Sequence, residues 1–299
     1  MTAGRHSIRG ADTPFMKLAH PNADLFVPDS LPVAEALART THLAVGAHAD
    51  DLEIMAYAGI ETCYQNPGEW FGGIVVTDGA GSARTGPYAG LDGEAMRRLR
   101  LQEQRRAAVV GEYAFVAQLG YPSAQLREGA DGAVADLAAL LRAARPRVVY
   151  VHNPADKHPT HIMTLQRTLA ALRGLAPEER PQALYGVEVW RDLDWLDDAA
   201  KVVLRTDRRP NLAQALMGLF DSQISGGKRY DLAVPGRRLA NATFFASHAV
   251  DAVESAAFAM DLSALLRDDR LTLAELVGAH LERFRDGVLR NLAEGAPQP

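Results

Sequence analysis

The stretch His42-Leu-Ala-Val-Gly-Ala-His-Ala-Asp-Asp-Leu-Glu53 decides the fold. Residues 42–47 form a short apolar run, which predicts a buried parallel strand. The periodic apolar segment 54–63 predicts a helix after it. Four polar side chains crowd the turn between the two: His48, Asp50, Asp51 and Glu53. Open α/β sheets bind ligands just outside the carboxyl ends of their strands, so this cluster lies where such folds carry chemistry.

Strand-like and helix-like segments alternate along the chain on both sides of this stretch. Apolar runs typical of strands occur at 71–76, 113–119, 148–151, 184–189 and 201–204. Helical patterns occur at 31–39, 94–110, 133–144 and 162–173. This alternation predicts βαβ units, and therefore a Rossmann-like α/β fold whose mostly parallel sheet carries helices on both faces.

The chain is expected to divide into three segments. Residues 1–40 form an N-terminal arm, and residues 41–225 form the α/β catalytic domain. Residues 226–299 form a C-terminal helical extension packed on the same domain. Within the extension, segments 256–266 and 271–281 are predicted as apolar helices. These helices either form the contact between subunits of a homo-oligomer or complete the core of the domain.

Composition excludes several classes of protein. The 299 residues are 47% hydrophobic and 23% charged, as in ordinary globular proteins. A net charge of -5 argues against a nucleic-acid partner. The only cysteine, Cys63, rules out an intrachain disulfide and is typical of a reducing compartment. Neither a signal peptide nor a membrane-spanning run is visible, so we expect a cytoplasmic protein with no membrane partner.

A second polar cluster follows the predicted strand 148–151. It contains His152, Asp156, His158 and His161. Imidazoles and carboxylates suit zinc, and a catalytic zinc keeps three protein ligands and an open position for water. Either cluster alone is equally compatible with a structural role, such as acids at a helix N-terminus. Two clusters at strand ends of one α/β chain favour a metal site.

Local geometry separates the members of the clusters. Asp50 and Asp51 are adjacent and are expected to point different ways, one toward a metal and one toward its water. Pro159 fits the first turn of a helix, which leaves His158 at the cap and His161 inside, three residues on and on the same side.

The two clusters also resemble a known family. Ala47-His-Ala-Asp-Asp-Leu-Glu53 resembles the A-H-P-D-D-x-E signature of the LmbE-like (PIG-L) N-acetylglucosaminyl deacetylases, and Asp156-Lys-His-Pro-Thr-His161 resembles their second signature, commonly H-P-D-H. Thr77-Asp-Gly79, Arg100-x-x-Glu103 and Ser222-Gln223 match the family pattern as well. The resemblance spans roughly residues 40–225 in the right order.

The resemblance implies a Rossmann-like fold with one divalent metal ion per chain, usually Zn²⁺ with Fe²⁺ as an alternative. It implies hydrolysis of the N-acetyl group of glucosamine-containing substrates, including precursors of mycothiol and bacillithiol, and often an oligomer. By residue, it implies that His48, Asp51 and His161 bind the metal and that Asp50 is the general base. His158 would stabilise the oxyanion or protonate the leaving amine.

Two residues depart from the family signatures. Ala49 replaces a proline, which loosens the turn without removing a chemical group. Thr160 replaces an aspartate that orients the neighbouring histidine, so the imidazolium form of His158 is less favoured here. Asp156 is the nearest carboxylate in the sequence that could substitute.

Substrate contacts are predicted from weaker patterns. Lys228, Arg229 and Arg238 lie near glycines and are candidates for a site that binds a phosphate or carboxylate on the substrate. A solvated basic loop or a subunit contact is the alternative. Asp78 and Arg84 lie in a Gly-rich loop after the second predicted strand and are further candidates.

The sequence therefore predicts a zinc-dependent hydrolase that removes an N-acetyl group from a small amino-sugar substrate. One alternative is a metal hydrolase of a non-sugar amide or ester. Another is a non-catalytic metal- or sugar-binding homologue, in which Thr160 marks lost activity. A nucleotide-binding protein is disfavoured because no G-x-G-x-x-G follows the first strand.

Overall fold

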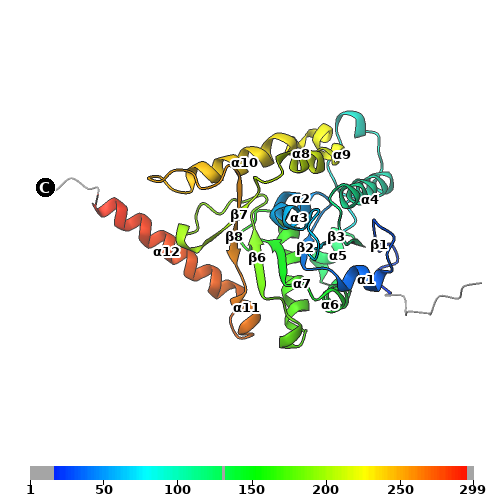
Figure 1. Ribbon diagram of the computed structural model, residues 1–299, viewed down its shortest axis with the longest axis horizontal. Helices are drawn as coiled ribbons and strands as arrows, with labels where there is room; N and C mark the ends of the chain where they lie inside the picture. The colour runs from blue at the N-terminus through cyan, green and yellow to red at the C-terminus, as the bar shows by residue number, and fades with distance from the viewer. Residues whose placement is uncertain (1–16, 130–131, 295–299) are drawn as a thin grey trace, which may run out of the picture.

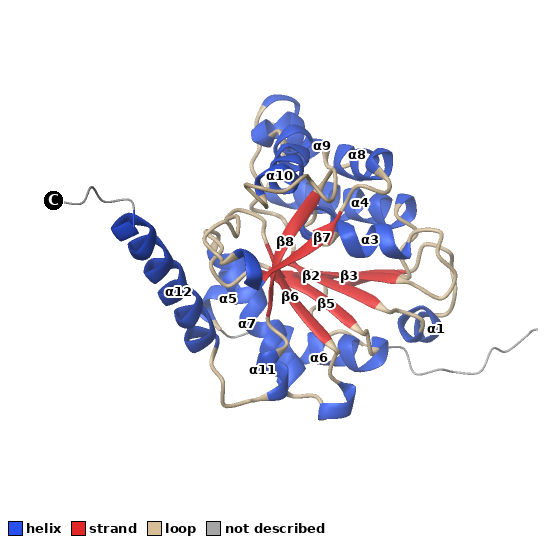
Figure 2. Ribbon diagram, turned by 60° about the vertical axis from the view of Figure 1, so that its left-hand side comes forward, coloured by secondary structure: helices blue, strands red, loops and turns tan. Residues whose placement is uncertain are grey.

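A computed structural model describes residues 17–129 and 132–294, so residues 1–16 of the predicted arm lie outside it. One eight-stranded sheet is covered by helices on both faces (Figures 1 and 2). The strands are β1 (Asp24–Phe26), β2 (His42–Gly46), β3 (Phe71–Thr77), β4 (Phe115–Tyr121), β5 (Val148–His152), β6 (Ala183–Val187), β7 (Lys201–Arg205) and β8 (Ala256–Asp261). The mostly parallel α/β fold predicted from the sequence is confirmed.

The helices fill the connections between these strands. They are α1 (Val33–Ala38), α2 (Asp51–Met55), α3 (Tyr57–Cys63), α4 (Gly93–Val110), α5 (Ser123–Glu128), α6 (Ala133–Ala144), α7 (Pro159–Arg173), α8 (Pro210–Gly218), α9 (Asp221–Gln223), α10 (Tyr230–Phe244), α11 (Ala264–Arg267) and α12 (Leu273–Glu294). The predicted helix 54–63 is interrupted at Ala56, which separates α2 from α3.

Strand order fixes the place of a ligand site. The sheet runs β1-β4-β3-β2-β5-β6-β8-β7. Strands β4, β3, β2, β5 and β6 are parallel, whereas β1 and β8 pair antiparallel with their neighbours. The order reverses between β2 and β5, and the carboxyl ends of those two strands are the switch point at which such sheets bind ligands. Both polar clusters follow these two strands.

Each face of the sheet has its own apolar core. Leu137, Leu141, Leu165 and Leu172 on α6 and α7 pack against one face. Leu52, Ile60 and Leu216 on α2, α3 and α8 pack against the other. Both cores consist of fully or nearly fully buried side chains, which is the arrangement that a parallel sheet requires.

The predicted helix over residues 256–266 is wrong. Residues 256–261 form strand β8, which lies between β6 and β7, and only Ala264–Arg267 is helical. Ala, Phe and Met in this run are compatible with helix, but its first five residues are buried and pair with strands on both sides. Tertiary pairing therefore overrides local preference, as is common for short apolar runs.

Helix α12 extends away from the body of the molecule (Figures 1 and 2). Leu273 and Leu276 at its start pack against the core, whereas Leu281, Phe284 and Leu292 further along are exposed.

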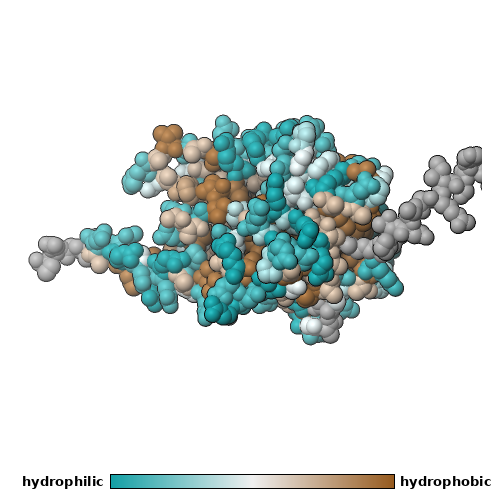
Figure 3. Space-filling view, turned by 60° about the horizontal axis from the view of Figure 1, so that its bottom comes forward, coloured by the Kyte–Doolittle hydropathy of each residue, from teal (hydrophilic) through white to brown (hydrophobic). Residues whose placement is uncertain are grey.

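Figure 3 shows one face of the protein, where hydrophilic side chains predominate and hydrophobic ones form small groups. Within the described ranges, every helix is too short or too polar to cross a membrane. The homo-oligomer stays a prediction.

Close packing of α3 on β5 gives a stability test. A Cβ added at Gly59 would lie 2.6 Å from Cε2 of Tyr150, whereas nothing lies within 4 Å of a Cβ added at Gly278 on α12. We expect Gly59→Ala to lower the free energy of unfolding by about 1–3 kcal/mol through overpacking. Gly278→Ala should raise it by up to about 1 kcal/mol, because alanine is the better helix former. Urea unfolding of both variants measures this, and equal effects would contradict the packing described here.

Candidate metal and catalytic site

Three side chains from the two clusters converge at the switch point. His48 and Asp51 follow β2, and His161 lies in the first turn of α7. Nδ1 of His48 lies 3.3 Å from Oδ2 of Asp51 and 3.3 Å from Nε2 of His161. The third edge of this triangle, from Asp51 Oδ2 to His161 Nε2, is 3.5 Å. Asp51 and His161 are buried, and His48 is partly exposed.

The triangle has the dimensions of a divalent-metal site. Donors about 2.1 Å from a zinc ion at tetrahedral angles lie roughly 3.4 Å from each other. All three edges fall within 0.1 Å or so of that value. Two imidazoles and one carboxylate are also a donor set that zinc and iron accept. These residues could therefore hold one such ion at the border of the cavity that His48 and Asp51 line.

Asp156 supports this triangle from behind. Its Oδ2 lies 3.3 Å from Nδ1 of His161, and both side chains are fully buried. Its Oδ1 accepts the backbone N–H of His158. Burial alone would lower the pKa of His161, but Asp51 and Asp156 raise it above its usual value. Asp156 thus orients His161, whereas Thr160, at the position of the family aspartate, offers its backbone N–H to Nδ1 of His158.

Asp50 lies beside the triangle, and its carboxylate pairs with Arg100 on α4. Its backbone has φ 92° and ψ −30°, a strained conformation for a residue with a Cβ. The amide N–H of Asp50 donates to Gln104, and its carboxylate accepts from Arg100 at 2.8 Å. Burial raises the pKa of Asp50 to about 6, against the opposing effect of Arg100. The hydrogen bonds with Arg100 and Gln104 hold Asp50 in place at the wall of the cavity.

Arg100 links distant parts of the chain. It is buried on α4 and donates to Asp50, to the carbonyl of Ala49 and to Glu103. Glu103 in turn accepts the N–H of Ser222 at 2.8 Å and its hydroxyl at 2.7 Å. The Arg100-x-x-Glu103 and Ser222-Gln223 pairs noted in the sequence therefore form one buried network behind Asp50.

His158 faces the triangle from the cap of α7. Its ring lies edge-on to His48, with centroids 4.9 Å apart, and near Trp190. Burial, together with His48 and His161, lowers the pKa of His158 to about 4, so the ring is neutral at pH 7. Because Nδ1 accepts from Thr160, the proton of the neutral ring is on Nε2. His158 can therefore donate a hydrogen bond but carries no charge.

His152 is a member of the second cluster that received no role from the sequence. It ends β5, its Nε2 accepts the N–H of Ala47, and its ring stacks on His161 with centroids 3.7 Å apart. Burial lowers its pKa to about 4. His152 thus connects the turn after β2 to α7. Its position at the end of a predicted strand is the feature of the sequence that could have indicated this role.

A polar cavity of about 370 Å³ opens over these residues. Among its lining side chains are His48, Asp50, His158, Arg100, Trp190 and Tyr230. Arg127, Ser82, Ser123 and Gln223 line it as well, and the sequence gave no reason to select the first three. The cavity thus combines metal-ligand candidates, a carboxylate, a neutral imidazole and several hydrogen-bonding groups.

Of the predicted substrate contacts, the structure places Lys228 on this cavity, with Nζ 4.7 Å from the ring centroid of Trp190. Arg84 donates to backbone carbonyls of its own loop, and Asp78 caps the N–H of Ala80. Arg229 pairs with Asp231 on the surface. Arg238 is buried and donates to the carbonyls of Glu53 and Ile54. Their part in substrate binding stays a prediction.

Known proteins resemble this chain in sequence and in fold. Residues 43–172 match the PIG-L family, described as GlcNAc-PI de-N-acetylase. No curated protein sequence matches the chain. Among solved structures, N,N'-diacetylchitobiose deacetylase from Pyrococcus horikoshii has a TM-score of 0.60 at 17% identity, covering 80% of this chain and 89% of that one.

Two further structures share the fold. The 4-carboxy-2-hydroxymuconate hydratase GalB from Pseudomonas putida KT2440 has a TM-score of 0.59 at 17% identity, over 78% of this chain and 98% of its own. A zinc-inhibited form of teicoplanin deacetylase has a TM-score of 0.54 at 14% identity, over 74% and 97%. At these identities the similarities show the fold alone.

The donor triangle predicts metal binding that depends on His161. We expect the purified protein to bind about one zinc or iron per chain and His161→Ala to lose it, because two donors hold the ion weakly. Asp156→Asn should weaken affinity about 10–100-fold, since it loosens the orientation of His161. His280→Ala, on the distant helix α12, is the matched control. Elemental analysis and chelator competition measure the metal content and affinity. Full metal content in His161→Ala would contradict the assignment of His161 as a metal ligand.

The network behind Asp50 predicts a large loss of stability when Arg100 is removed. Arg100→Ala leaves the buried carboxylates of Asp50 and Glu103 without their cation, at a cost of about 3–5 kcal/mol. Arg98→Ala, on the same helix but 63% exposed, should change the free energy of unfolding by less than about 1 kcal/mol. Denaturant titration separates the two, and similar small losses would show that the network contributes little.

Proposed function

Because residues 43–172 form a PIG-L family domain, we propose that this protein is a metal-dependent hydrolase that removes an N-acyl group, in the simplest case acetyl, from a small amino-sugar substrate. The observation that carries the proposal is the donor triangle of His48, Asp51 and His161 beside Asp50 in a polar cavity. One ion per chain, zinc or iron, fits the triangle. A cytoplasmic location belongs to the same proposal.

A divalent ion supplies Lewis acidity here: it makes water a nucleophile near neutral pH and polarises the acyl carbonyl. Asp50, held by Arg100, accepts a proton from the attacking water. The water oxygen bonds to the acyl carbon, and the oxyanion that develops accepts a hydrogen bond from Nε2 of His158. Asp50 then passes its proton to the amine nitrogen as the C–N bond breaks, which releases a carboxylic acid and a free amino sugar.

The state of His158 favours one of its two predicted roles. A neutral ring with its proton on Nε2 suits the donor of a hydrogen bond to the oxyanion. Protonation of the amine would require the imidazolium, which burial and neighbouring histidines disfavour. The uncharged Thr160 agrees with this assignment. Asp50 is then the group that both takes and returns the proton.

Polar groups around the cavity are suited to a sugar. Ser82, Ser123 and Gln223 offer hydrogen-bonding side chains, and Trp190 offers an aromatic face. The exposed cations Arg127 and Lys228 stand at the same cavity and suit a substrate that carries a phosphate or carboxylate. A metal hydrolase of a non-sugar amide or ester, and a binding protein without turnover, are the rival functions that an activity screen separates.

The role of Asp50 gives the direct test. We expect Asp50→Asn to keep the metal and to lower kcat for N-acetyl amino sugars by about 10²–10⁴, the usual loss for a general base. Asparagine also tolerates the positive φ at this position. Asp194→Asn, on an exposed aspartate far along the chain, is the control. Acetate release and metal content are measured together, and an unchanged rate in Asp50→Asn would overturn the assignment.

A further inference from the structure

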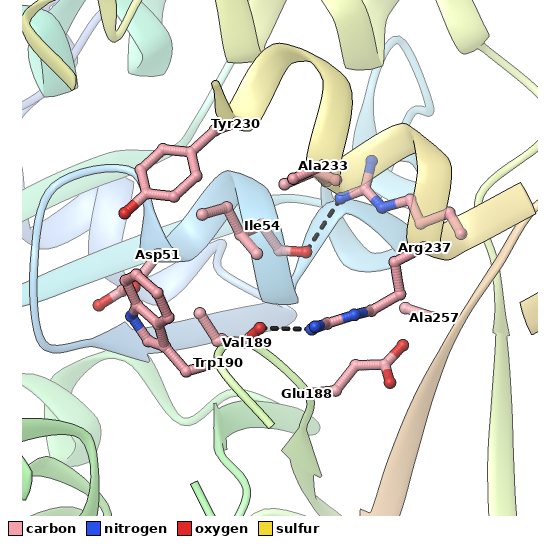
Figure 4. A pocket seen from close by; sticks show the side chains of 11 residues that line it. Asp51, Ile54, Glu188, Val189, Trp190, Tyr230, Ala233, Arg237 and Ala257 are labelled. Carbon is pink, nitrogen blue, oxygen red and sulfur yellow. Dashed lines mark hydrogen bonds between the residues drawn. The ribbon is translucent and has the colours of Figure 1, made fainter. Parts of the chain in front are cut away.

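A second cavity shares three of its lining residues with the polar cavity, and one of them is the candidate metal ligand Asp51. Asp51, Trp190 and Tyr230 line both. From there the second cavity, of about 160 Å³, runs between α10 and the segment after β6 (Figure 4). We call it the apolar pocket and define it by five side chains: Ile54, Val189, Ala233, Val234 and Ala257. His48, Asp50 and His158 line only the polar cavity.

The charged groups at the walls of the apolar pocket are held by the protein itself. Arg237 donates to the carbonyl of Val189 (Figure 4). Arg238 donates to the carbonyls of Glu53 and Ile54. The buried Glu188 accepts the N–H of Phe258 and a side-chain N–H of Asn241 through Oε1, whereas its Oε2 has no hydrogen-bond partner among the described residues. These contacts fix the walls, so the surface offered to a ligand between Trp190 and Ala257 is mainly apolar.

An N-acyl amino sugar has a polar sugar part and an apolar acyl part, and the linings of the two cavities differ in polarity in the same way. The sugar side is rich in hydroxyls and matches the polar cavity, where Asp50, Arg100 and Lys228 stand. The acyl side is apolar and matches the pocket beyond Trp190 and Tyr230. The scissile bond would then lie where the cavities meet, beside Asp51. The opposite orientation would place hydroxyls against Ile54 and Val234, whose side chains offer no hydrogen bond, and burying them there is costly.

The size of the apolar pocket exceeds that of an acetyl group. A cavity of about 150 Å³ holds a benzene molecule, which has six carbon atoms. The methyl of an acetyl group would leave most of this pocket without contacts, and its lining would lose the dispersion energy of close packing. An acyl chain of four to six carbons fills the space.

We propose that the acyl group removed by this protein is apolar and larger than acetyl, with about four to six carbons seated in the apolar pocket. The inference rests on the proposed function and names its acyl specificity. The reaction is hydrolysis: water oxygen bonds to the acyl carbon, the C–N bond breaks, and the amine nitrogen takes the proton. The products are a C4–C6 carboxylic acid and the free amino sugar.

The experiment compares binding of N-acetyl-, N-butyryl- and N-hexanoyl-D-glucosamine to zinc-loaded Asp50→Asn protein by calorimetry. That substitution is chosen because it should slow turnover about 10²–10⁴-fold, so binding is read with little hydrolysis. Each buried methylene should tighten binding about fourfold, and the hexanoyl sugar should therefore bind at least tenfold more tightly than the acetyl sugar. Equal affinities for the three sugars would overturn the proposal.

Two matched variants locate the effect. Ala233→Phe adds an aromatic ring at the mouth of the pocket, whereas Leu232→Phe adds one to the exposed neighbouring position, which does not line the pocket. Ala233→Phe should reduce the hexanoyl-to-acetyl affinity ratio at least tenfold, and Leu232→Phe should leave the ratio as it is. An unchanged ratio in Ala233→Phe would place the acyl chain elsewhere and overturn the proposal.

Free acids separate this inference from the proposed function. Hexanoate and acetate are titrated into the wild-type protein and into Ala233→Phe, and no hydrolysis is required. Tighter binding of hexanoate that is lost in Ala233→Phe supports the pocket even if wild-type protein hydrolyses none of the three sugars, a result that would reject only the proposed function. Failure of hexanoate and of all three sugars to bind would overturn the acyl pocket.

Discussion

The buried guanidinium of Arg100 is the group on which the candidate site depends. Carboxylates in a protein interior cost several kcal/mol unless a charge or several hydrogen bonds compensate them. Arg100 compensates Asp50 and Glu103 at once, and Glu103 ties α4 to Ser222 nearly 120 residues further along the chain. The strained backbone of Asp50 persists because this network over-determines it. The geometry of the site therefore depends on the ion pairs that Arg100 forms with Asp50 and Glu103 behind it.

Much of the site is readable from the sequence because its members lie close together in the chain. His48, Asp50 and Asp51 occupy one turn, and His158 and His161 occupy another, so local spacing is enough to separate their directions. Arg100 is different, since Arg97 and Arg98 beside it look the same and point to solvent or to Glu94. The family pattern singles out Arg100 through its spacing to Glu103, but only the packing of α4 on the turn after β2 shows that Arg100 pairs with Asp50. Asp156 is a similar case, because its reach to His161 depends on the loop between β5 and α7.

The fold by itself leaves the chemistry open. A deacetylase and a hydratase both have this arrangement of strands and helices. Hydrolysis of an N-acetyl group and hydration of a double bond both need an activated water, and what differs is the shape and polarity of the space around it. In this protein two spaces of opposite polarity meet at Asp51. The division between the lining of Ile54, Val189 and Val234 in one space and that of Asp50 and His158 in the other therefore carries more functional information than the strand order does.

The position of β8 has a consequence for the protein during its synthesis. The partner edge of β6 is complete once Val187 has been made, yet the strand that covers it ends at Asp261. At about 5–20 residues per second, a ribosome needs roughly 4–15 s to make the segment between them. Throughout that interval the nascent chain carries a central strand with an open edge, the feature that recruits neighbouring chains into aggregates. We therefore expect the yield of this protein to depend on the translation speed through residues 188–261 and on chaperones that cover strand edges.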